Sequence, residues 1–101
     1  MKDSLRRVVK EERVCVIGAG RIGLPIAICL ADSGCKVTLI EIDESRVEMI
    51  NSGNSPFFEP GMQELLGEVV EKGLLFATKE NSMISGCKTV ISAIGTGMDE
   101  K

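Results

Sequence analysis

Short apolar runs alternate with amphipathic stretches along most of the chain. Runs rich in β-branched residues are typical of strands buried on both faces, and four are predicted, at residues 13–17, 36–42, 74–78 and 88–94. Between the strands, apolar residues recur at helical spacing, which predicts helices at residues 21–32, 44–50 and 62–72. The last helix is the clearest, because its apolar residues fall on one face and Gly73 ends it.

This alternation predicts the fold class. Strands that alternate with helices form an α/β fold, here a Rossmann-type doubly wound parallel sheet with the strand order 3-2-1-4. Residues 13–101 are expected to form the N-terminal part of an NAD(P)-binding Rossmann domain. Residues 1–12 are polar and form an N-terminal arm, either a short amphipathic helix or a frayed end. Ligands of such sheets bind beyond the carboxyl ends of the strands, where the first and fourth strands diverge.

A glycine-rich turn follows the first strand and reads Gly18-Ala19-Gly20-Arg21-Ile22-Gly23. The spacing alone is a weak signal, but here a buried strand precedes it and an apolar helix follows it. Gly18 then allows the tight turn, Gly20 allows a pyrophosphate to approach the backbone, and Gly23 allows the helix to pack on the strand. The helix N-terminus favours a phosphate, so the turn predicts a dinucleotide site. The alternative is a strand-turn-helix corner that binds nothing.

Glu41 stands near the end of the second predicted strand, where such folds place an acid that accepts hydrogen bonds from ribose hydroxyls. Its negative charge would repel a 2′-phosphate, so NAD is favoured over NADP. Asp43 is a rival for this role, although its position fits the N-cap of the next helix better. Arg46, one turn into that helix, would lie over the adenine or ribose, or would be an ordinary exposed charge.

Composition narrows the function further. A net charge of −3 and three aromatic residues give no support for nucleic acid as a partner. The sequence contains no histidine and no cysteine spacing typical of metal sites, so neither a metal nor a catalytic histidine is expected. No apolar run approaches the roughly 20 residues that span a bilayer, and no signal peptide begins the chain. We therefore expect a cytoplasmic protein with reduced thiols and no membrane partner.

With these residues placed, the chain resembles the UDP-glucose/GDP-mannose 6-dehydrogenase family. The resemblance begins with the run Val-Ile-Gly-Ala-Gly-Arg-Ile-Gly-Leu-Pro-Ile-Ala at residues 16–27, and it continues through residues 41–47 and 50–53. The strongest marker is Ser-Pro-Phe-Phe-Glu-Pro-Gly-Met-Gln-Glu-Leu-Leu at residues 55–66, which generic Rossmann domains lack. The resemblance covers residues 13–99, nearly the whole chain.

The resemblance implies an NAD-dependent oxidation of the C6 alcohol of a UDP- or GDP-hexose to a uronate. It implies that Gly18, Ala19, Gly20, Arg21, Ile22 and Gly23 bind the pyrophosphate, that Glu41 and Arg46 contact the adenosine ribose, and that Ile94, Gly95 and Thr96 border the nicotinamide half. Three positions depart from the family pattern. Glu41 replaces an aspartate, Gly97 replaces a proline, and Arg21 stands where an aromatic residue is common.

The resemblance also predicts what these residues do not do. The catalytic cysteine, the catalytic lysine and the sugar-binding domain of the family lie beyond residue 101, and none of the four cysteines matches the catalytic motif. The chain is thus expected to be an incomplete dinucleotide-binding domain that does not catalyse by itself, with the nucleotide sugar bound by other domains. The fourth strand would leave an exposed sheet edge through which the chain self-associates. Alternatives are a nucleotide-sensing Rossmann module or the cofactor domain of another hydroxyacid dehydrogenase.

Overall fold

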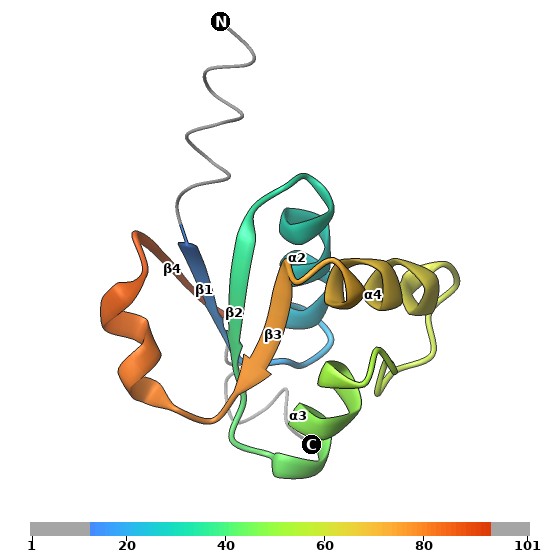
Figure 1. Ribbon diagram of the computed structural model, residues 1–101. Coiled ribbons are helices and arrows are strands. Elements are labelled where there is room, and N and C mark those ends of the chain that lie inside the picture. Colours follow the sequence, from blue (N-terminus) through green and yellow to red (C-terminus); the bar gives the residue numbers. More distant parts are fainter. Residues whose placement is uncertain (1–12, 94–101) are drawn as a thin grey trace, which may run out of the picture.

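A computed structural model gives the fold of residues 13–93, and Figure 1 shows their arrangement. The strands are β1 (Arg13–Ile17), β2 (Lys36–Ile40), β3 (Leu75–Thr78) and β4 (Thr89–Ser92). The helices are α2 (Gly23–Asp32), α3 (Glu44–Asn51) and α4 (Met62–Glu71), and η1 (Asn81–Gly86) is a 3₁₀-helix. The predicted arm at residues 1–12 and the predicted site residues 94–96 lie outside the described residues.

The four strands form a parallel sheet in the order β3-β2-β1-β4, which confirms the predicted fold class and strand order. In the register of this sheet, Val37 stands beside both Val14 and Leu75. Residues in register point to the same face of a sheet, so these three side chains and those two positions further along form one apolar surface. The predicted β-branched runs therefore form strands, and the apolar side chains on this face are buried under the helices.

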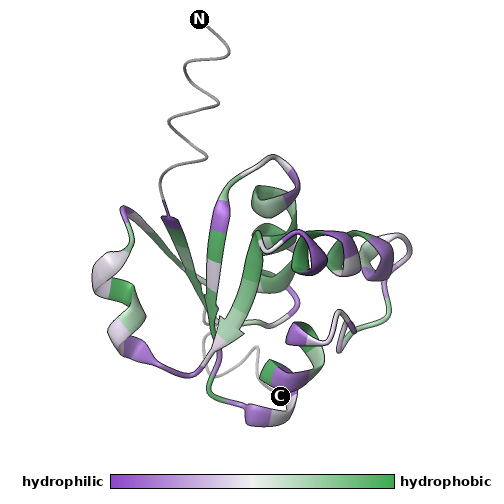
Figure 2. Ribbon diagram, in the orientation of Figure 1, coloured by the Kyte–Doolittle hydropathy of each residue, from purple (hydrophilic) through white to green (hydrophobic). Residues whose placement is uncertain are grey.

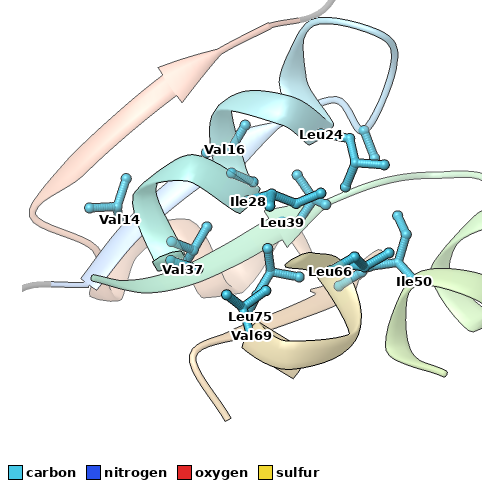
Figure 3. Close-up of a cluster of buried hydrophobic side chains, with 14 of the residues drawn as sticks. Val14, Val16, Leu24, Ile28, Val37, Leu39, Ile50, Leu66, Val69 and Leu75 are labelled. Atoms are coloured by element: carbon cyan, nitrogen blue, oxygen red, sulfur yellow. The ribbon is translucent and has the colours of Figure 1, made fainter. Parts of the chain in front are cut away.

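The main core lies between this surface and the helices, as Figure 3 shows. Helix α2 packs across β1, β2 and β3, and α4 packs against α2 and β3. Leu24 and Ile28 of α2 and Leu66 of α4 are 0–1% exposed. Figure 2 shows the green apolar residues concentrated on the strands and on the helix faces turned toward them, with purple polar residues on the outer faces. The helices are thus amphipathic, as the spacing of their apolar residues in the sequence predicts.

Helix α3 is joined to the sheet by two hydrogen bonds between the Asn51 side chain and the backbone of β3. The amide of Asn51 donates to the carbonyl oxygen of Ala77 at 2.9 Å and accepts from the Ala77 N–H at 2.8 Å. The N–H and the carbonyl oxygen of Ala77, on a strand at the edge of the sheet, are thereby both hydrogen-bonded. Helix α3 thus lies beside β3 at the edge of the sheet.

The second face of the sheet is covered over β1 by the 3₁₀-helix η1. Cys15 points to this face, away from α2, and is fully buried. Burial and the neighbouring Cys87 raise the pKa of the Cys15 thiol from its ordinary value of 9.0 to about 11. The thiol therefore stays protonated in the folded chain at pH values where the unfolded chain ionises it.

Stability is expected to fall in alkaline solution for this reason. The contribution of Cys15 is fully present below pH 9.0 and is lost as the pH rises toward about 11, because only the unfolded state releases the proton in this range. The free energy of unfolding drops by about 2–3 kcal/mol across it. Urea unfolding between pH 8 and 11 measures this loss, which the variant Cys15→Ala should not show. If the free energy of unfolding fell equally with pH in the wild type and in Cys15→Ala, the raised pKa of Cys15 would be contradicted.

Candidate functional site

The glycine-rich turn lies where three strands end. Gly18 follows β1 directly and has φ of 99°, a backbone conformation that favours glycine. Its N–H donates to the Ile40 carbonyl at the end of β2, at 2.8 Å. The N–H of Ala93, just after β4, donates to the Ile17 carbonyl at 2.8 Å. The carboxyl ends of β2, β1 and β4 are therefore joined around this turn, as expected at the switch point of a doubly wound sheet.

Gly23 and Gly20 meet different surroundings. A Cβ atom on Gly23 would lie 1.8 Å from the carbonyl oxygen of Gly18 and 3.1 Å from the Cβ of Ala93, so helix α2 can start this close to the turn only with glycine. A Cβ atom on Gly20 would have nothing within 4 Å. The backbone at Gly20 thus faces open space. This fits the roles predicted for the two glycines.

The start of α2 has no side-chain cap. Its N-cap residue is Ile22, which makes no side-chain hydrogen bond to the first turn and is 63% exposed. Helix α2 begins at Gly23 and not at Arg21 as the apolar pattern predicts, because residues 21 and 22 still belong to the turn. In the first turn, the Leu24 N–H donates to the Gly20 carbonyl at 3.0 Å, and Pro25 has no N–H. The positive end of the helix dipole at this uncapped start suits a phosphate group.

Glu41 is held against the turn. It follows β2, which ends at Ile40 and is two residues shorter than predicted, and it is 7% exposed. Its Oε1 accepts a hydrogen bond from the Ala19 N–H at 2.8 Å, and its Oε2 accepts one from the Asp43 N–H at 3.0 Å. A guanidinium nitrogen of Arg46 lies 3.7 Å from Oε1. The acid after the second strand, the turn and α3 are thereby brought together.

Asp43 has the other role predicted for it, as N-cap of α3. Its Oδ1 accepts hydrogen bonds from the Ser45 N–H at 3.0 Å and from the Arg46 N–H at 3.3 Å. The hydroxyl of Ser45 also donates to it, and these bonds lower the pKa of the Asp43 carboxyl. Asp43 is thus committed to the helix end, and Glu41 is the acid nearer the turn.

Phe57 also lies in this group, a position that residue spacing does not predict. Its ring centroid lies 4.9 Å from the Cζ of Arg21 and 5.2 Å from the Cζ of Arg46. These distances are within the range of cation–π contacts. The sequence does contain a signal, the pair of adjacent aromatic residues before Glu59-Pro60-Gly61. This pair indicates an unusual segment, but it does not indicate which residues the rings contact.

The segment that carries Phe57 has its own fixed shape. Gln63 of α4 accepts a hydrogen bond from the Ser55 N–H at 2.9 Å and donates one to the Gly53 carbonyl. Residues 55–61, with Gln63 and Glu64, line a hollow of about 580 Å³, and Phe58 on this segment is 95% exposed. The hollow lies along this segment, whereas the turn and Glu41 form no part of its lining.

Most of the predicted site residues therefore meet in one place: Gly18, Ala19, Gly20, Arg21, Ile22, Gly23, Glu41 and Arg46. Ile94, Gly95 and Thr96 lie outside the described residues. Within residues 13–93 no three acidic, cysteine or histidine side chains gather as they would around a metal ion. In the same part of the chain, no helix has the length and apolar character of a membrane span.

Comparison with known proteins shows which sequences this chain resembles. The sequence model described as "UDP-glucose/GDP-mannose dehydrogenase family, NAD binding domain" matches residues 12–101. UDP-glucose 6-dehydrogenase of Pseudomonas aeruginosa is 35% identical over 89 residues, which are 87% of this chain and 20% of that protein. GDP-mannose 6-dehydrogenase of Azotobacter vinelandii is 41% identical over 66 residues, 65% of this chain and 15% of that protein. The chain thus spans about a fifth of the length of such relatives.

Solved structures agree with this match. A ternary complex of GDP-mannose dehydrogenase from Pseudomonas aeruginosa superposes with a TM-score of 0.80 at 28% identity, covering 83% of this chain and 20% of that one. NDP-N-acetyl-D-galactosaminuronic acid dehydrogenase from Methanosarcina mazei gives 0.78 at 36% identity, covering 91% and 22%. The sheet described above is therefore the sheet of these dehydrogenases.

Proposed function

Because the chain belongs to the UDP-glucose/GDP-mannose dehydrogenase family, whose NAD-binding domain it matches, we propose that the residues around the glycine-rich turn form its NAD site. The observation that carries this proposal is the hydrogen bond from the Ala19 N–H to Glu41 at 2.8 Å. This bond sets the acid that follows β2 directly beside the turn. The match to the family supports this function over a nucleotide-sensing module and over another hydroxyacid dehydrogenase.

The residues present fit the two halves of ADP-ribose. The open space at Gly20 and the uncapped start of α2 suit the pyrophosphate, with the backbone of Arg21, Ile22 and Gly23 facing it. The carboxylate of Glu41 has further lone pairs with which to accept hydrogen bonds from the ribose hydroxyls. Arg46, next to Glu41, lies on the same side of the site. The chemistry of these residues thus supports an ADP-ribose site at this edge of the sheet.

We place the nicotinamide half near Ile94, Gly95 and Thr96. The support is the resemblance to the family, together with the hydrogen bond from the Ala93 N–H to the Ile17 carbonyl, which sets the end of β4 beside the glycine-rich turn. When bound, NAD accepts a hydride from the substrate. The residues of this chain bind and orient the cofactor, and none of its cysteines is proposed as a nucleophile.

For the whole reaction, we propose the oxidation of the C6 alcohol of a UDP- or GDP-hexose to a uronate. The relatives that support this are a UDP-glucose 6-dehydrogenase and a GDP-mannose 6-dehydrogenase. The nucleotide sugar and the catalytic groups would be provided by parts of a dehydrogenase other than these residues. We therefore expect the 101 residues to bind the cofactor and to leave UDP-glucose unchanged.

Calorimetric titration tests the proposal. The chain is titrated with NAD, ADP-ribose and NADP under the same conditions, with nicotinamide mononucleotide as the control ligand. We expect NAD and ADP-ribose to bind with similar affinity and NADP more weakly, because Glu41 repels a 2′-phosphate. Tighter binding of NADP, or no binding of ADP-ribose, would refute the assignment.

Self-association through β4 is proposed as a further property. Among the described strands β4 stands at the end of the sheet, and its residues Thr89, Val90 and Ser92 are exposed. Exposed strand edges pair with other strands. Sedimentation should show a mass that increases with concentration and that the variant Val90→Lys reduces. A monomer at every concentration would contradict this.

The cytoplasm is the compartment we propose. All four cysteines lie within residues 13–93 and are free thiols, and Cys29 among them is exposed. Free exposed thiols persist in a reducing compartment, whereas secreted domains of this size commonly carry disulfides.

A further inference from the structure

The ring of Phe57 brings together two arginines from different parts of the chain. Arg21 comes from the glycine-rich turn and Arg46 from α3, while Phe57 belongs to the connection between α3 and α4. Both guanidinium carbons lie near the same ring centroid, at 4.9 and 5.2 Å. A guanidinium stacks well on an aromatic ring, which fixes the direction of an otherwise flexible side chain.

The ring itself is a fixed platform. Phe57 is half-buried and packs against the main core. Its N–H donates to the Ser55 hydroxyl at 3.2 Å, and that hydroxyl donates to the Phe57 carbonyl at 2.7 Å. The side chain of Gln63 holds Ser55 in turn at 2.9 Å. The backbone around the ring is thereby anchored to α4, whereas Arg21 is exposed and depends on the ring for its position.

The cluster places two guanidiniums beside the start of α2, where the nearby carboxylates of Glu41 and Asp43 are already engaged by backbone N–H groups. Glu41 is the carboxylate beside it, 3.7 Å from Arg46, and it is shared with the N–H groups of Ala19 and Asp43. Asp43 uses its carboxylate to cap α3, and the nearby Glu44 pairs with Lys79 at 2.6 Å. Guanidinium groups donate hydrogen bonds in pairs to phosphate oxygens, so two of them next to an uncapped helix start suit an anion with several oxygens, such as a diphosphate.

We propose that Phe57 is a positioning residue for cofactor binding, which holds Arg21 and Arg46 toward the adenosine diphosphate half of NAD. The proposal rests on the proposed function of the turn. It assigns to Phe57 a part in binding the cofactor, although the ring itself need not touch the ligand.

Variants of Phe57 test this directly by titration of the full chain with ADP-ribose and with nicotinamide mononucleotide. Phe57→Leu keeps an apolar side chain but removes the ring, and should weaken ADP-ribose binding about five- to twentyfold. Phe57→Tyr keeps the ring and should restore the affinity to within about twofold. Affinity for the mononucleotide should not change in either variant. Equal affinity of Phe57→Leu and the wild type for ADP-ribose would overturn the proposal.

A double-mutant cycle separates positioning from general packing. In a chain with Arg21→Ala and Arg46→Ala, the change Phe57→Leu should have no further effect on ADP-ribose affinity, because there is nothing left to position. The same loss in both backgrounds would show a purely structural role and contradict the proposal. Should Phe57→Leu fail to fold, the surface variants Arg21→Ala and Arg46→Ala decide, since each must weaken ADP-ribose and spare the mononucleotide. A wild-type chain that binds no ADP-ribose would refute the proposed function, and this inference with it.

Discussion

Replacing Gly23 with alanine is expected to destabilise the chain by about 3 kcal/mol and to abolish NAD binding. The new Cβ atom would lie 1.8 Å from the carbonyl oxygen of Gly18 and 3.0 Å from its carbonyl carbon. Both are backbone atoms of the tight turn, so neither can move aside as a side chain would. The start of α2 must separate from the end of β1, and the proposed pyrophosphate site separates with it.

Thermal unfolding followed by circular dichroism measures the effect, which corresponds to a decrease of about 15 °C in Tm for a domain of this size. The matched control is Gly20→Ala, because a Cβ atom there meets nothing within 4 Å. This control should unfold within a few degrees of the wild type and yet bind NAD more weakly, since its methyl group occupies the space open to the pyrophosphate. A Tm of Gly23→Ala equal to that of the control would be incompatible with the geometry of the turn.

Replacing Glu41 with glutamine is expected to change both the cofactor preference and the stability. The amide keeps one acceptor oxygen, so one of the N–H groups of Ala19 and Asp43 loses its partner, at a cost of about 1–2 kcal/mol. Removal of the charge also removes the repulsion of a 2′-phosphate. At a separation of about 5 Å this repulsion is worth roughly 1–3 kcal/mol, so the preference for NAD over NADP should decrease at least about fivefold.

Competitive titration of NAD and NADP measures the change in preference. Glu48→Gln provides the control, because it removes the same charge from an exposed position on α3. That variant should keep the wild-type preference. An unchanged ratio in Glu41→Gln would show that another group selects the cofactor.

The sequence was sufficient for the fold because its local signals agreed with one another. The β-branched runs, the turn glycines and the caps all favour the same alternation, and Asp43 caps α3 as its position indicated. The turn and Glu41 were recognisable for the same reason. Each belongs to a strand-turn-helix unit whose geometry depends on neighbouring residues.

The remaining features depend on contacts between segments that are distant in the sequence. The bond between Ala19 and Glu41 arises only when β1 and β2 pair. The position of Phe57 depends on how the connection between α3 and α4 folds back toward the turn. Residue spacing carries no information about that path, so the aromatic contact with both arginines could be found only in three dimensions.

Amide NMR during titration with NAD tests the central claim most directly, because it locates the cofactor on the folded chain. The account predicts that the largest shifts occur at residues 18–23, at Glu41 and at Arg46, and that they saturate together. Residues lining the hollow at 58–64 should change little. Shifts confined to that hollow, or no saturable shift at the turn, would contradict the claim that the glycine-rich turn and Glu41 bind NAD.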